Sequence, residues 1–224
     1  MNSGSDKMLS QKNIIVVVLL SMLMFACSEP TANTRGVYML LDTSGTYTEE
    51  MNKASNILNY LLVKLAPGDS LAVARIDSGS FSEKDIIAKV TFDDRPSVTN
   101  QQKRGFREKM DNFVKTLKGS PYTDITGGII QAVQFLEETN SAKKTILIFS
   151  DMEEDLVAGQ VRDFALELKG CEVIALNVTK LRSDQVDPRD YMKRLDSWRA
   201  RIEQGGGSFR VINDLERLER IFAD

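Results

Sequence analysis

The most informative segment of the chain is VYMLLDTSGT, residues 37–46. Its first five residues are apolar, which is typical of a strand buried on both faces of a parallel sheet. Asp42, Ser44 and Thr46 follow at every second position, so in an extended segment their side chains can point the same way. A buried strand that ends in oxygen-bearing side chains indicates a ligand site at the carboxyl edge of an α/β sheet.

Strand and helix patterns alternate along the rest of the chain. Strands are expected at residues 37–41, 70–76, 86–92, 145–149, 173–178 and 209–212, and helices at 51–65, 98–118, 129–136, 156–168, 191–202 and 215–222. Residues 86–92 have a period of two, which favours an edge strand. The pattern predicts an α/β fold, with a doubly wound, mostly parallel central sheet, one antiparallel edge strand and helices on both faces.

A short apolar segment stands near the N-terminus. Lys7 and Lys12 precede the apolar run 14–25. A membrane-spanning helix needs about 20 apolar residues, which is more than this run offers. A basic start, a short apolar run and a small residue before a break together predict a secretory signal peptide over residues 1–26.

Cys27 directly follows Ala26, and this order resembles the signal of bacterial lipoproteins, in which the cysteine receives lipid and becomes the first residue. The resemblance implies a lipid anchor on a cell-envelope membrane, with the domain facing the periplasm or the exterior. Ser28, in place of aspartate, favours the outer membrane. Residues 27–34 are interpreted as a tether and residues 35–224 as one domain. A plain signal peptide or an uncleaved anchor is the alternative.

Composition excludes several function classes. The 224 residues include no histidine, which removes Ser-His-Asp and Cys-His catalysis and histidine-ligated zinc. With 29 basic and 32 acidic residues, the net charge of −3 provides no basic surface for nucleic acid. If Cys27 carries lipid, Cys171 has no disulfide partner, and its apolar neighbours predict a buried, unreactive thiol.

Two later segments bring further oxygen ligands to the expected sheet edge. Asp151 follows the strand at 145–149, and Thr123 lies in a loop that enters a helix. Carboxylate and hydroxyl oxygens without nitrogen or sulfur suit Mg²⁺ or Mn²⁺. The candidate metal ligands are therefore Asp42, Ser44, Thr46, Thr123 and Asp151.

The same segments resemble von Willebrand factor A domains. Residues 42–46 are similar to the Asp-x-Ser-x-Ser motif of that family's metal-ion-dependent adhesion site. Residues 122–129 resemble the loop that supplies its threonine ligand, and residues 148–151 the strand end that supplies its second aspartate. The resemblance implies a non-enzymatic protein-binding or adhesion module, in which a partner's Asp or Glu completes the shell of a bound Mg²⁺.

The chain departs from that pattern at two places. Thr46 replaces the second serine, and Met152 replaces the glycine that often follows the second aspartate, before the acidic run 153–155. Two other functions are alternatives to metal-dependent adhesion. In a haloacid dehalogenase-like phosphohydrolase Asp42 would be the nucleophile, but Ser44 stands where that family carries an acid/base aspartate. The second alternative is an envelope lipoprotein that binds no metal.

Overall fold

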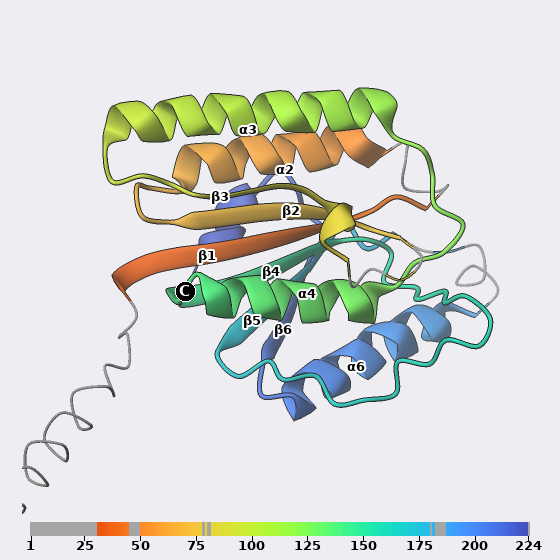
Figure 1. The fold of residues 1–224 in the computed structure, drawn as a ribbon. Helices are drawn as coiled ribbons and strands as arrows, with labels where there is room; N and C mark the ends of the chain where they lie inside the picture. Colours follow the sequence, from red (N-terminus) through yellow and green to blue (C-terminus); the bar gives the residue numbers. More distant parts are fainter. Residues whose placement is uncertain are drawn as a thin grey trace, which may run out of the picture.

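The computed structural model describes residues 31–44, 50–77, 79, 82–179, 181 and 187–223. These residues form a six-stranded sheet in the order β3-β2-β1-β4-β5-β6 (Figure 1). β3 pairs antiparallel with β2, and every other pair in this sheet is parallel, which confirms the expected edge strand. The strands are β1 (Thr31–Asp42), β2 (Ser70–Ile76), β3 (Ile86–Thr91), β4 (Ser141–Phe149), β5 (Cys171–Leu176) and β6 (Ser208–Ile212).

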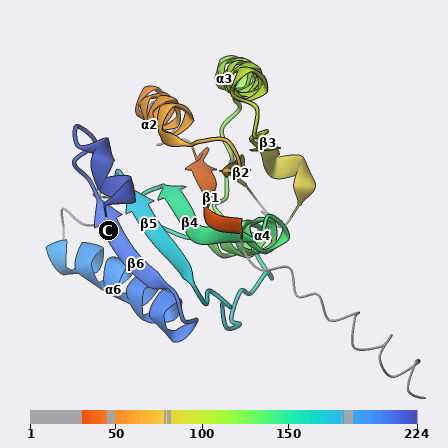
Figure 2. The same cartoon turned by 90° about the vertical axis from the view of Figure 1, so that its left-hand side faces the viewer.

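Helices cover both faces of the sheet, as predicted (Figure 2). α2 (Met51–Lys64) and α3 (Pro96–Thr116) lie on one face, and α4 (Ile125–Glu138) and α6 (Pro188–Gln204) lie on the other. Two short 3₁₀ segments, η2 (Glu83–Asp85) and η3 (Leu218–Phe222), complete the described regular elements. No helix within the described residues is long and apolar enough to cross a membrane.

β1 shows why the core has two halves. Met39 belongs to the cluster under α2 and α3, whereas Tyr38 and Leu40 belong to the cluster under α4 and α6. All three side chains are at most 1% exposed, and burying a side chain of this size stabilises the fold by about 1.5–3 kcal/mol. α4 approaches β1 closely, because a Cβ atom on Gly128 would lie 2.9 Å from a Leu40 methyl group.

The expected helix at residues 156–168 is absent, and this prediction is wrong. Within the described stretch 151–170 there is no helix or strand. Gly159 has φ of +88°, in a turn that the Gln160 amide closes on the Val157 carbonyl. Beyond it Leu168 is buried, and its amide donates to the Gly205 carbonyl at 2.8 Å. The apolar residues recur at helical spacing, but a turn and tertiary hydrogen bonds determine the backbone here.

Arg162 fixes this irregular segment to the start of α4. Its guanidinium binds the Asp124 carboxylate through both Nη2 (2.7 Å) and Nε (3.2 and 3.3 Å), and the Asp124 side chain is 1% exposed.

Arg162→Met is expected to lower the free energy of unfolding by about 3 kcal/mol, because it leaves a buried carboxylate without its cation. Urea unfolding measures the change. Arg189→Met is the matched control, since Arg189 pairs with Asp187 while its own side chain is 83% exposed, and surface pairs contribute at most about 1 kcal/mol. Equal losses in the two variants would contradict the structural role of Arg162.

The two ends of the described chain also differ from expectation. β1 begins at Thr31, within the predicted tether, and of the helix expected at 215–222 only η3 forms. Asn213, which precedes that segment, accepts a hydrogen bond from the Val178 amide at 2.8 Å through its side chain. The predicted signal peptide and Cys27 lie outside the described residues.

Candidate functional site

Asp42 is the last residue of β1 and is 1% exposed. Its Oδ1 accepts a hydrogen bond from the Ser44 amide at 2.8 Å, and its Oδ2 accepts one from the Ser150 hydroxyl at 2.7 Å. Burial raises the pKa of Asp42, and the hydrogen bonds from Ser44 and Ser150 oppose that rise. The site therefore holds a desolvated carboxylate in one fixed orientation.

Asp151 brings a second carboxylate to the same edge. It lies two residues beyond Phe149, which is aligned with Leu41 in the neighbouring strand, and it is 5% exposed. Its Oδ1 accepts from the Glu153 amide at 2.9 Å. The pKa of Asp151 is raised to about 6, first by burial and further by the negative charge of Asp42. Asp42 and Asp151 are thus close enough to repel each other, and a bound cation would relieve that repulsion.

The loop that carries Thr123 is joined to both of these segments. Ser44 forms a bridge with Ser120, whose amide donates to the Thr43 carbonyl at 2.8 Å. Thr123 forms an antiparallel bridge with Asp155, with amide-to-carbonyl distances of 2.8 and 3.1 Å. Thr123 is 5% exposed, and among the described residues its hydroxyl has no hydrogen-bond partner. Within the described part of the chain, that hydroxyl is therefore a candidate ligand.

Four of the five predicted ligands therefore belong to three segments that are hydrogen-bonded to one another at the carboxyl ends of β1 and β4. Thr46 lies outside the described residues. Within the described part of the chain, no three Asp, Glu or Cys side chains lie together as a metal cluster. A cation at this edge would be held by two carboxylates together with hydroxyls and water. Such a donor set of hard oxygens fits Mg²⁺ or Mn²⁺.

The neighbouring residues have structural roles that the sequence left open. Asp124 is the N-cap of α4 and accepts from the Gly127 amide at 2.8 Å. Gly127 is required there, because a Cβ atom would lie 2.6 Å from that carboxylate. The glycine pair at 127–128 thus serves packing and capping.

The acidic run after Asp151 is partly neutralised. Glu154 accepts from the Thr126 amide at 2.7 Å, at the start of α4, and lies 3.7 Å from Arg201. Glu153 lies 3.5 Å from Arg194. The run begins no helix of its own in the described stretch 151–170, and Glu154 instead lies at the start of α4.

Sequence reasoning missed three residues that organise this edge. Ser150 joins Asp42 to the loop after β4, because its hydroxyl donates to Asp42 and also accepts from the Met152 amide at 3.0 Å. Arg194 and Trp198 donate from α6 to backbone carbonyls of the same loop. The position of Ser150 next to Asp151 was a usable signal, whereas nothing in the sequence connects α6 with residues 43 and 46 positions earlier.

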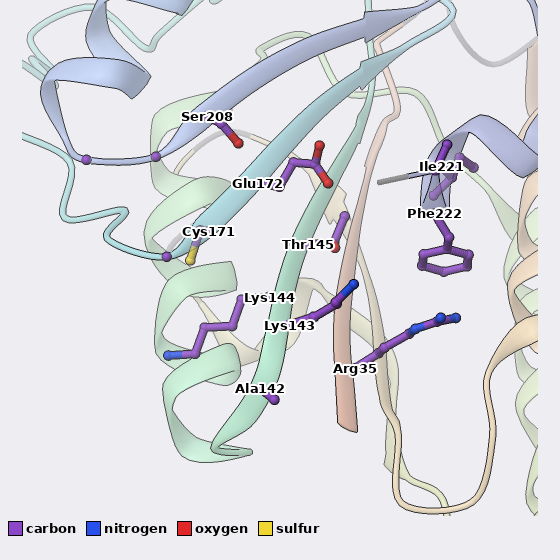
Figure 3. Close-up of a pocket in the computed structure, with 14 residues that line it drawn as sticks. Arg35, Ala142, Lys143, Lys144, Thr145, Cys171, Glu172, Ser208, Ile221 and Phe222 are labelled. Atoms are coloured by element: carbon purple, nitrogen blue, oxygen red, sulfur yellow. The ribbon is translucent and has the colours of Figure 1, made fainter. Parts of the chain in front are cut away.

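A pocket of about 440 Å³ lies at the opposite edge of the sheet, where β1, β4, β5 and β6 begin (Figure 3). The guanidinium of Arg35 stands 4.9 Å from the Phe222 ring beside it. Glu172 lines the pocket and pairs with Arg210 at 2.5 Å. Cys171, which also lines it, is a buried free thiol, as predicted. This pocket is separate from the four described candidate ligands, which lie at the carboxyl ends of the strands.

Comparisons with known proteins identify the fold. No family model and no curated protein matches the sequence. Two similar solved structures are a von Willebrand factor type A protein from Catenulispora acidiphila (15% identity, TM-score 0.50) and a mutant PilB minor pilin from Streptococcus sanguinis (10%, TM-score 0.52). The matches cover 84% and 87% of this chain but only 41% and 61% of those chains, so this chain spans less than two thirds of either. The fold is that of a von Willebrand factor A domain, as residues 42–46 implied.

Proposed function

We propose that the chain is a metal-dependent protein-binding module whose cation lies between Asp42 and Asp151. The observation that carries the proposal is the pair of buried carboxylates, which raise each other's energy in the absence of a cation. The available hydroxyl of Thr123 supports it. The proposal includes the absence of enzymatic activity.

The candidate ligands would make two kinds of contribution to the cation site. Asp42 and Asp151 supply the negative charge, while Ser44, Thr46 and Thr123 supply neutral oxygens, directly or through water. Because neutral ligands leave the cation electron-poor, Mg²⁺ or Mn²⁺ would accept a further carboxylate. That carboxylate would come from an Asp or Glu of a protein partner. The loops at 119–126 and 151–156 would surround it and select the partner.

The phosphohydrolase alternative gains no support from the site. Ser44 contributes its amide and hydroxyl to Asp42, and a hydroxyl does not replace the acid/base carboxyl that this chemistry needs near neutral pH. A lipoprotein that binds no metal is the other alternative. Calorimetric titration of the full-length chain with Mg²⁺ and Mn²⁺ separates the two hypotheses. The metal-free alternative predicts no heat of binding, and the proposed function predicts heat with either ion.

Thr123→Val is expected to weaken Mn²⁺ binding at least tenfold, because it replaces a candidate ligand oxygen with a methyl group of nearly the same size. Calorimetry measures the affinity. Thr145→Val is the matched control, since Thr145 is also buried, at 7% exposed, but lies at the other end of the sheet. Unchanged affinity in Thr123→Val, or an equal loss in both variants, would contradict the assignment of Thr123.

The anchoring of the module is part of the proposal. Lipid on Cys27 would hold the domain on an envelope membrane, facing the periplasm or the exterior, with the outer membrane favoured by Ser28. Labelled palmitate is expected to enter the chain in bacterial cells and to be absent from Cys27→Ser. Incorporation that persists in that variant would rule out Cys27 as the anchor.

A further inference from the structure

Met152 has an unusual backbone for its residue type. Its φ is +64°, in the left-handed region that non-glycine residues seldom adopt, and its side chain is 0% exposed. It directly follows Asp151, the second proposed carboxylate ligand. A backbone of this kind persists only where surrounding contacts hold it.

All four polar atoms of the two peptide groups that flank Met152 are hydrogen-bonded. In the peptide before it, the Met152 amide donates to Ser150 Oγ at 3.0 Å, and the Asp151 carbonyl accepts from Arg194 Nε at 3.0 Å. In the peptide after it, the Glu153 amide donates to Asp151 Oδ1 at 2.9 Å, and the Met152 carbonyl accepts from Trp198 Nε1 at 2.9 Å. Holding both planes fixes φ and ψ of the residue between them.

This arrangement ties the Asp151 carboxylate to the conformation of Met152. The Glu153 amide that orients Asp151 Oδ1 belongs to the peptide after Met152, so rotation about Met152 moves that donor. The Ser150 hydroxyl that accepts from the Met152 amide also donates to Asp42. Both proposed carboxylate ligands are therefore oriented through the turn at Met152.

The two side chains that donate to the Asp151 and Met152 carbonyls lie on one face of α6. Arg194 and Trp198 are one helical turn apart, so they project in the same direction, toward the loop after β4. Both side chains are well covered, with 9% of the Arg194 side chain and 6% of Trp198 exposed. A third member of this face, Arg201, donates to Thr126 Oγ1 at 2.7 Å, so α6 is also attached to the start of α4.

We propose that Arg194 and Trp198 are positioning residues that hold Met152 in its left-handed conformation and thereby aim the Asp151 carboxylate at the cation site. They take over the role of a glycine, which would adopt this conformation without support. The consequence for metal binding rests on the proposed function. The coupling between α6 and Met152 does not.

The metal arm of the test uses Mn²⁺ calorimetry on the full-length chain. Trp198→Phe removes the indole N–H and keeps an aromatic ring, and it is expected to weaken Mn²⁺ binding roughly three- to tenfold, as for one lost hydrogen bond. With Met152→Gly already present, the same change is expected to weaken binding less than twofold. An equal loss in both backgrounds would overturn the inference, because a purely structural role of Trp198 predicts no rescue by glycine.

The second arm needs no metal. In chelator, Trp198→Phe is expected to lower the urea midpoint more in the native background than in Met152→Gly, since the packing lost with the Met152 side chain is common to both glycine variants and cancels in the cycle. Arg194→Met should show the same coupling. Arg199→Met is the control, because Arg199 donates from α6 to the Phe209 carbonyl, away from the site, and its effect should be independent of residue 152.

The two arms distinguish a failure of the proposed metal binding from a failure of the positioning role. If the native chain binds no Mn²⁺, the proposed function fails and the urea cycle alone decides the inference. If Mn²⁺ binds but Trp198 acts additively with Met152 in both arms, and Arg194 does so in the urea cycle, the positioning role is wrong and the metal site stands.

Discussion

Replacing Asp42 with asparagine is expected to weaken Mg²⁺ and Mn²⁺ binding at least a hundredfold. The change removes one of the two charges that the site offers a cation and keeps a side chain of the same shape. Because burial raises the pKa of Asp42, its ionised form is disfavoured in the folded protein. The metal-free variant should therefore unfold at the same urea concentration as the native protein or a higher one.

Asp69→Asn is the matched control. Asp69 is also a buried carboxylate, at 4% exposed, and accepts from the amides of Arg35 and Ala66, but it lies at the opposite edge of the sheet. It should lose stability and keep native metal affinity. If Asp42→Asn retains affinity within threefold of the native value, the cation does not bind at the end of β1.

The second large effect is a pH-dependent gain in stability in Asp151→Asn. In chelator, the folded-state pKa of Asp151 is raised to about 6 from the ordinary value of 3.8. The stability that neutral Asp151 gives is fully present below about pH 4, and it is lost as the pH rises through 6. Asparagine stays neutral, so above pH 7 the variant should be more stable than the native protein by up to about 3 kcal/mol.

Urea unfolding at pH 4, 5.5 and 7.5 measures this difference, which should vanish toward pH 4. With saturating Mn²⁺ at pH 7.5 the order should reverse, because the cation stabilises only the protein that binds it. A variant that is less stable than the native protein at pH 7.5 in chelator would show that Asp151 is not an unfavourably buried charge.

The sequence predicted the parts of the fold that depend on local apolar patterns. Residues 37–41 could be assigned to a central parallel strand because every side chain in the run is apolar, and 86–92 to an edge strand because the pattern alternates. The order of strands and helices then determined the sheet. That the segments of Asp42, Ser44, Thr123 and Asp151 meet at one edge followed from the strand ends, whereas the role of these residues as ligands, Thr46 and Cys27 remain predictions.

What the sequence could not predict depends on tertiary contacts. Val161 and Phe164 fit a helical spacing, but they are 74% and 44% exposed in an irregular segment that Arg162 and Gly205 hold. The role of α6 at the site was equally hidden, because the apolar pattern around Trp198 indicates only a helix face. Trp198 is a core residue, at 6% exposed, and its one polar atom also holds the Met152 carbonyl. The sequence pattern is the same for a buried side chain that only packs and for one that also holds a backbone carbonyl.

The most direct test of the cation site is the anomalous scattering of Mn²⁺ in crystals of the protein grown with that ion. A single strong peak is predicted within direct coordination distance of oxygens of the Asp42–Ser44 segment, with Thr123 and Asp151 oxygens in direct contact or one water away. Mn²⁺ bound elsewhere, or no peak between these side chains at millimolar Mn²⁺, would contradict the account.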